Sequence, residues 1–98
     1  MPGTASLSTH VLDTEHGRPA SGVRVELWQE ALVAAAETDD DGRIAELAAG
    51  LEAGLYRLVF HPPSPFFRRV ELELSLDAGH YHVPLLVSPF SWTSYRGS

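Results

Sequence analysis

The sequence contains neither cysteine nor lysine. Without cysteine there is no thiol nucleophile, no disulfide and no thiolate ligand for a metal. All seven basic residues are arginine, so Schiff-base chemistry and a lysine general base are excluded as well. Any catalysis must therefore rely on His, Asp, Glu, Ser, Thr, Tyr and Arg. Asparagine is also absent, and because the codons for asparagine and lysine are AT-rich, this composition favours a GC-rich bacterial genome.

Positive charge and long apolar runs are also scarce. The 98 residues include 13 acidic and 7 basic ones, a formal net charge of −6, which disfavours binding to nucleic acid or to an anionic membrane. No run approaches the ~20 apolar residues that span a bilayer, and the N-terminus has no signal-peptide pattern, so a cytoplasmic protein is expected. The 44% hydrophobic content supports one core. We expect an N-terminal tail at 1–6 and a single domain at 7–98.

Short apolar segments recur roughly every eight to twelve residues between clusters of Gly, Pro and Asp, a spacing typical of an all-β sandwich. The clearest segment is 70–76, where apolar and polar residues alternate as in a strand with one buried face. Residues 32–38 are alanine-rich and suit a helix by propensity, but the Asp-Asp-Asp-Gly turn that follows favours a hairpin strand. Residues 48–54 are expected to be a connector with at most one helical turn. Eight strands are predicted, at 7–12, 23–28, 32–38, 43–47, 55–61, 70–76, 81–87 and 91–95.

Five histidines are the main chemical feature, since imidazole titrates near neutral pH and binds metals. His80 and His82 are alternate residues, so on a strand both rings point to one side. With His10 as a third ligand they could hold zinc with one open position; alternatively, His80 is solvated near a turn. His10 lies in an apolar strand and is either a packed or surface residue or a catalytic one. Arg43 could pair with the aspartates of the preceding turn or bind a carbonyl or oxyanion.

The end of the sequence is aromatic, with Pro-Phe-Ser-Trp-Thr-Ser-Tyr at 89–95. Free termini usually fray, so this composition predicts a tail that is held against something. Trp92 and Tyr95 could equally pack on the chain's own sheet.

Three segments resemble the 5-hydroxyisourate hydrolases, also called transthyretin-like proteins. They are Ser-Thr-His-Val-Leu-Asp (8–13) followed by Gly-Arg-Pro-Ala (17–20); Asp-Gly-Arg (41–43); and His-Tyr-His-Val-Pro-Leu-Leu (80–86) with a final Tyr-Arg-Gly-Ser (95–98). The resemblance runs from about Leu7 to Ser98. The His-Tyr-His stretch with the terminal Tyr-Arg-Gly-Ser is specific, and it separates these hydrolases from true transthyretins.

The resemblance implies an all-β, transthyretin-like (prealbumin-like) eight-stranded β-sandwich that forms a homotetramer, a dimer of dimers with sites at the subunit interface. It implies hydrolysis of 5-hydroxyisourate, the product of urate oxidation, to 2-oxo-4-hydroxy-4-carboxy-5-ureidoimidazoline, with no metal and no organic cofactor. Carried over by motif, the catalytic residues are His10, Arg43 and His82. The substrate would contact His10 and Arg43, together with Tyr95 and Ser98 of the tail. Opening a cyclic amide needs a base, an oxyanion partner and a proton for the leaving nitrogen. We therefore expect the two histidines to move protons, Arg43 to polarise the carbonyl and Tyr95 to orient the ring.

The sequence departs from this family in two places. Pro-Pro-Ser-Pro-Phe-Phe at 62–67 replaces the short helix that family members carry after the strand at 55–61, so we expect that helix to be shortened or absent. Ser-Trp-Thr-Ser at 91–94 stands where a Gly-Tyr-Ser-Thr type of sequence is usual. Trp92 could alter the tetramer or the mouth of the site.

Two other classes of function fit the same fold. The first is a non-catalytic, transthyretin-like module that binds a small aromatic ligand in a central channel. Hormone-carrying transthyretins, however, use lysine at the channel mouth and lack the catalytic histidines, whereas this chain has the histidines and no lysine. The second is a structural sandwich that serves as an interaction domain. It gives no reason for His10, Arg43, His82 and the Tyr-Arg-Gly-Ser tail to occur together.

Overall fold

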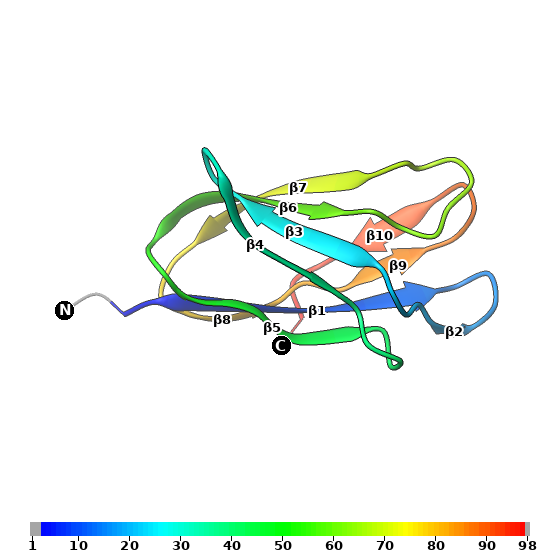
Figure 1. Ribbon diagram of the computed structural model, residues 1–98, viewed down its shortest axis with the longest axis horizontal. Helices are drawn as coiled ribbons and strands as arrows, with labels where there is room; N and C mark the ends of the chain where they lie inside the picture. Colours follow the sequence, from blue (N-terminus) through cyan, green and yellow to red (C-terminus); the bar gives the residue numbers. More distant parts are fainter. Residues whose placement is uncertain (1–2, 98) are drawn as a thin grey trace.

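The computed structural model describes residues 3–97 as two β-sheets packed face to face (Figure 1). The first sheet has six strands arranged around β1, and the second has four in the order β4-β3-β6-β7. β1 pairs in parallel with β8 and β9, and the other strand pairs are antiparallel. The strands are β1 (Ala5–Asp13), β2 (Arg18–Pro19), β3 (Arg24–Trp28), β4 (Leu32–Glu37), β5 (Arg43–Leu51), β6 (Gly54–Phe60), β7 (Val70–Leu76), β8 (Gly79–His82), β9 (Leu85–Val87) and β10 (Trp92–Ser94). The predicted all-β sandwich is therefore confirmed.

The core lies between the two sheets and follows the two-residue period of their strands. In β1 the odd-numbered residues Leu7, Thr9 and Val11 are buried, so the even-numbered ones point to the outer face of the sheet. Leu27 and Phe60 of the facing sheet are fully buried against them. Burial of each large apolar side chain contributes about 1.5–3 kcal/mol. This fixes the register of β1, because a slip by one residue would turn its core face outward.

The structure has ten strands where eight were predicted. One addition is β2, a two-residue strand beside the end of β1. The other arises because the predicted strand at 81–87 is split into β8 and β9 at Pro84, which has no N–H to donate to a ladder. The buried hydroxyl of Thr9 donates to the carbonyl oxygen of Val83 at 2.7 Å, so the break leaves that carbonyl satisfied.

The connector predicted at 48–54 is wrong, because β5 continues to Leu51. β5 buries Ile44, Leu47 and Leu51, whose spacings of three and four residues do not fit a regular strand. Two register shifts in the β1–β5 ladder absorb the extra residues, and each brings the next leucine back to the core face. Sequence alternation cannot reveal such bulges.

The predicted loss of the family helix is confirmed, since residues 3–97 contain no helix. The loop after β6 is instead closed by Ser64, whose hydroxyl accepts the backbone N–H groups of Phe66 and Phe67 and donates to the carbonyl of Pro89. The ring of Phe66 makes edge contacts with those of Phe67 and Phe90. Within residues 3–97, no helix is long and apolar enough to cross a membrane.

Candidate functional site

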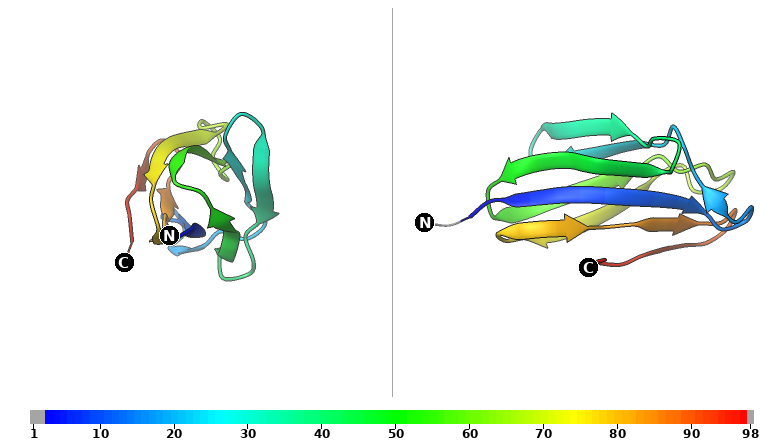
Figure 2. Two further views of the ribbon diagram at one scale, coloured as in Figure 1. Left: turned by 90° about the vertical axis from the view of Figure 1, so that its left-hand side faces the viewer. Right: turned by 90° about the horizontal axis from the view of Figure 1, so that it is seen from below.

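Three adjacent strands bring polar side chains together on the outer face of the six-stranded sheet. β5, β1 and β8 lie side by side there (Figure 2, right). Ser8 is in register with His82 across the parallel β1–β8 ladder, and His10 is in register with Arg43 across the antiparallel β1–β5 ladder. Because alternate residues share a face, the structure collects the three predicted catalytic residues, His10, Arg43 and His82, on one surface.

The turn before β5 places Arg43 opposite His10. The carboxylate of Asp39 accepts the backbone N–H groups of Asp41 and Arg43, each at 2.9 Å. Gly42 has a φ of 73°, and a Cβ atom there would lie only 2.4 Å from the carbonyl oxygen of Val11. Glycine is therefore required by both conformation and space. The predicted alternative, a salt bridge from Arg43 to the turn aspartates, does not form: within residues 3–97 its guanidinium makes no ion pair.

The hydrogen bond of His10 shows which of its ring nitrogens carries a hydrogen. Its Nε2 atom lies 2.9 Å from the carbonyl oxygen of Asp41, and a carbonyl can only accept. Nε2 therefore carries a hydrogen and donates it, and in the neutral ring the lone pair is on Nδ1. Nδ1 makes no hydrogen bond to the described residues, so it is available to a substrate or to water.

Two serines and two histidines form a continuous hydrogen-bonded chain across β1 and β8. Ser6 Oγ lies 2.7 Å from His80 Nδ1, Ser8 Oγ lies 2.9 Å from His80 Nε2, and Ser8 Oγ lies 2.8 Å from His82 Nδ1. Sequence analysis did not assign the serines to the site. Ser6, Ser8 and His10 are alternate residues and therefore share the outer face of β1. This spacing alone does not assign the serines to the site, because their contacts with the histidines depend on the register of β8.

The same bonds bear on the zinc alternative. Both ring nitrogens of His80 and Nδ1 of His82 are occupied by serine hydroxyls. Among residues 3–97, no three His, Asp or Glu side chains are grouped so that they could hold a metal ion. His80, His82 and His10 therefore share a surface without forming a three-ligand set.

His82 is the histidine whose ionisation the site changes. Burial lowers its pKa below the ordinary value of 6.5, and the positive charges of Arg43, His10 and His80 lower it further. Each of these causes disfavours the imidazolium form. The ring of His82 is therefore neutral at pH 7, with its Nε2 atom making no hydrogen bond inside residues 3–97.

The tail is held against β8, as its composition predicted. The guanidinium of Arg96 lies 4.2 Å from the centre of the Tyr81 ring, a cation–π contact. Gly97 donates its backbone N–H to the carbonyl oxygen of His82 at 2.6 Å. Tyr95 is 55% exposed and lines a groove between β7 and β10. Ser98 lies outside the described residues.

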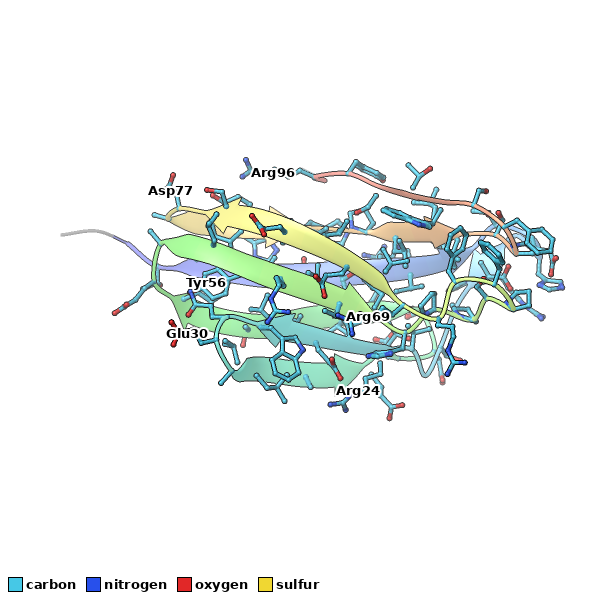
Figure 3. All side chains as sticks on the ribbon, turned by 90° about the horizontal axis from the view of Figure 1, so that it is seen from above. Arg24, Glu30, Tyr56, Arg69, Asp77 and Arg96 are labelled. Carbon is cyan, nitrogen blue, oxygen red and sulfur yellow. The ribbon has the colours of Figure 1, made fainter. Side chains whose placement is uncertain are left out.

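A second polar cluster, on the outer face of the four-stranded sheet, is internally paired. Figure 3 looks onto this face and shows Arg24 and Arg69 there. The Glu26 carboxylate accepts the indole N–H of Trp28 at 3.0 Å and Nε–H of Arg24 at 2.6 Å, and His61 lies 3.5 Å away. The Trp28 and Arg24 hydrogen bonds lower the pKa of Glu26 to about 2. The groups of this cluster are thus bonded to one another, whereas the guanidinium of Arg43 has no carboxylate partner within residues 3–97.

The fold and the site together define a two-sheet β-sandwich whose outer face carries a neutral histidine, a second histidine and an arginine. The HIUase/Transthyretin family model matches residues 7–97, and the chain belongs to this family. It is 40% identical to 5-hydroxyisourate hydrolase of Deinococcus radiodurans, with all of both chains covered; that alignment spans 119 positions against the 98 residues of this chain.

Solved structures of family members have the same fold. The structure of Klebsiella pneumoniae 5-hydroxyisourate hydrolase has a TM-score of 0.88 and 37% identity, covering 96% of this chain and 99% of that one. Transthyretin from Sparus aurata has a TM-score of 0.84 but 29% identity, covering 93% and 95%. The fold is thus shared by both branches of the family, and the higher identity is to the hydrolase.

Proposed function

We propose that this protein hydrolyses 5-hydroxyisourate to 2-oxo-4-hydroxy-4-carboxy-5-ureidoimidazoline in urate degradation, without a cofactor. The observation that supports this most directly is the grouping of His10, Arg43 and His82 on one face of the sheet. Relatives that are 37–40% identical over nearly the whole chain carry the name of this hydrolase. The alternative, a non-catalytic ligand-binding module, gives no role to a neutral histidine beside an arginine that has no ion pair within residues 3–97.

The proposed mechanism is attack of water on a ring amide carbonyl. His82 is neutral at pH 7, so Nε2 accepts a proton as the water oxygen bonds to the carbonyl carbon. Arg43, which has no carboxylate partner among the described residues, stabilises the negative charge that develops on the carbonyl oxygen. The C–N bond then breaks, and His10, having taken a proton from solvent at Nδ1, delivers it to the leaving nitrogen. The proton taken by His82 is returned to solvent, which completes the cycle.

The tail is proposed to complete the substrate-binding surface, with Tyr95 orienting the ring and Ser98 lining the site. Two contacts support this: Gly97 bonds directly to the backbone of His82, and Arg96 stacks on Tyr81 of the same strand. We propose that residues 7–98 make up the one catalytic domain.

We further propose a homotetramer, built as a dimer of dimers. β7 and β10 are edge strands that each pair on one side only within the described chain, and such edges can continue a sheet into a second copy. Their shared groove carries the exposed rings of Trp92 and Tyr95. The site itself lies on an open sheet face, so a second copy covering it would exclude water and strengthen its electrostatics. Bacterial origin is supported by the bacterial relatives; a cytoplasmic location stays a prediction.

The test generates 5-hydroxyisourate from urate with a urate oxidase and follows its decay by ultraviolet absorbance. We expect this protein to accelerate decay above the spontaneous rate, and His82→Ala to lose ~100-fold or more, as for a general acid–base residue. His61→Ala is the matched control, because His61 is an exposed histidine just after β6 of the other sheet. No acceleration by folded protein would contradict the proposed activity, and an active His82→Ala would remove that histidine from the mechanism.

A further inference from the structure

The Ser8 hydroxyl lies between the two histidines of β8 and can donate to only one of them. Its oxygen is 2.9 Å from His80 Nε2 and 2.8 Å from His82 Nδ1. A serine hydroxyl has one hydrogen and two lone pairs, so Ser8 either donates to one ring and accepts from the other, or accepts from both. Whether Ser8 donates to His82 or accepts from it determines which nitrogen of His82 carries the ring hydrogen.

Three arrangements satisfy the three bonds when both rings are neutral. In the first, Ser6 donates to His80 Nδ1, His80 Nε2–H donates to Ser8, and Ser8 donates to His82 Nδ1. The hydrogen of His82 is then on Nε2, the atom that would have to accept a proton. In the second, His82 Nδ1–H donates to Ser8, Ser8 donates to His80 Nε2, and His80 Nδ1–H donates to Ser6. The lone pair of His82 is then on Nε2. In the third, Ser6 donates to His80 Nδ1, and Ser8 accepts from both His80 Nε2–H and His82 Nδ1–H, which again leaves the lone pair of His82 on Nε2.

The second and third arrangements are compatible with proton uptake, and only in the second does the Ser8 hydrogen also have an acceptor within the chain of bonds. When Nε2 gains a proton, the Nδ1–H bond to Ser8 is already in place, and no hydroxyl has to turn. In the first arrangement Nε2 is already protonated, and the ring could act as a base only after its hydrogen moved to Nδ1 and its bond to Ser8 reversed. The hydrogen bond at one nitrogen of an imidazole thus decides the chemistry of the other.

We propose that Ser6, His80 and Ser8 form a relay that holds His82 in its Nδ1–H tautomer, leaving Nε2 as the base. The three are positioning residues, since they act through His82 and not on the substrate. This inference rests on the proposed function, in which His82 takes a proton from water. It also gives the first histidine of the His-Tyr-His stretch a task, which is to accept the hydrogen bond of Ser8.

Two substitutions separate the relay from a merely structural role. Ser8→Ala removes the link, so the tautomer of His82 is no longer selected, and we expect kcat to fall roughly 10–100-fold with little change in KM. His80→Phe removes the acceptor of the Ser8 hydrogen, so Ser8 can donate to His82 Nδ1 as well as accept from it, and we expect kcat to fall over the same range. His80 is exposed, so this variant should fold even if Ser8→Ala does not. Ser21→Ala, at an exposed loop serine, is the control and should match the wild type.

The tautomers can be observed directly by NMR of protein labelled with ¹⁵N in its histidines, because protonated and unprotonated ring nitrogens have well-separated shifts. We expect His82 to be protonated at Nδ1 in the wild type and to be a mixture of the two tautomers in both Ser8→Ala and His80→Phe. Ser8→Thr, which restores a hydroxyl, should recover the wild-type tautomer and most of kcat. Wild-type His82 protonated at Nε2, or unchanged kcat in both variants while His82→Ala is inactive, would overturn the relay and leave the hydrolase function intact. Full activity of His82→Ala would instead contradict the proposed function.

Discussion

Substitution of Gly97 by alanine tests how tightly the tail is packed against the site. A Cβ atom at position 97 would lie 2.7 Å from Cδ2 of His82 and 3.3 Å from its carbonyl oxygen, whereas ordinary contacts begin near 3.4 Å. Either the imidazole or the tail must therefore move by about 0.7 Å. If the ring moves, it is pulled from Ser8, which holds Nδ1 at 2.8 Å. If the tail moves, it loses the 2.6 Å bond from Gly97 N–H to His82 and strains the Arg96–Tyr81 contact.

Either movement displaces a group that the proposed reaction needs. A misplacement of about 1 Å can cost roughly 100-fold in rate, so we expect kcat/KM of Gly97→Ala to fall by about 30–100-fold. The fold should persist, because the substitution is at the end of the chain and opposes no buried core residue. Far-UV circular dichroism should therefore be unchanged, with a thermal midpoint within a few degrees of the wild type.

The assay is the decay of 5-hydroxyisourate, measured with wild type, Gly97→Ala and Thr93→Ala. Thr93 is exposed on β10, so its alanine variant controls for substitution of the tail away from His82. A Gly97→Ala rate within threefold of the wild type would refute the reasoning, because it would show that the tail and ring can separate without consequence. A large loss of folded protein would also refute it, since the clash is predicted to be local.

Three further predictions concern ionisation and stability. Burial and then the charge of Arg43 lower the pKa of His82, so this pKa should rise toward 6.5 in Arg43→Leu. As the pH is lowered, the residual kcat/KM of this variant should therefore begin to fall at a higher pH than that of the wild type. An unchanged fall of kcat/KM at acid pH would contradict an effect of Arg43 on His82. The pKa of Glu26 is lowered from 4.5 to about 2, so the stability that its carboxylate contributes is complete above pH 4.5 and is lost as the pH falls toward 2. In urea titrations, the free energy of unfolding should therefore decrease less between pH 4.5 and 2 in Glu26→Gln than in the wild type. The buried hydroxyl of Thr38 donates to a backbone carbonyl at 2.7 Å and accepts a backbone N–H at 2.9 Å, so Thr38→Val should lower the free energy of unfolding by about 2–3 kcal/mol; urea titration giving less than about 0.5 kcal/mol would count against it.

The strands whose sequences alternate regularly were predictable. Residues 70–76 were predicted as a strand, and β7 occupies that range, because period-two burial is a local property that the sequence displays directly. The extension of β5 to Leu51 was not predictable, because its bulges depend on how β1 pairs with it. Likewise, the split at Pro84 reflects a switch in the part of β1 that each half contacts.

The candidate site shows the same division. The motif resemblance predicted His10, Arg43 and His82, and the structure places them on one face. The role of Ser8 was missed, because a serine on an outer sheet face is ordinary until its neighbours across the ladder are known. Sequence gives the order of residues along each strand, whereas the bond from Ser8 to two histidines depends on the parallel register of β1 and β8.

During folding, the candidate site can form only after β1 has paired with β8. Ser6 and His80 are 74 positions apart, yet their side chains are bonded. Closing so long a loop costs conformational entropy before any contact repays it, and non-local strand pairing is slow. The β6–β7 hairpin, by contrast, joins neighbouring segments and can form from local contacts. A refolding chain will therefore form strands before it forms the candidate site. Recovery of activity should then be a later and stricter sign of complete folding than recovery of the circular dichroism signal of the strands.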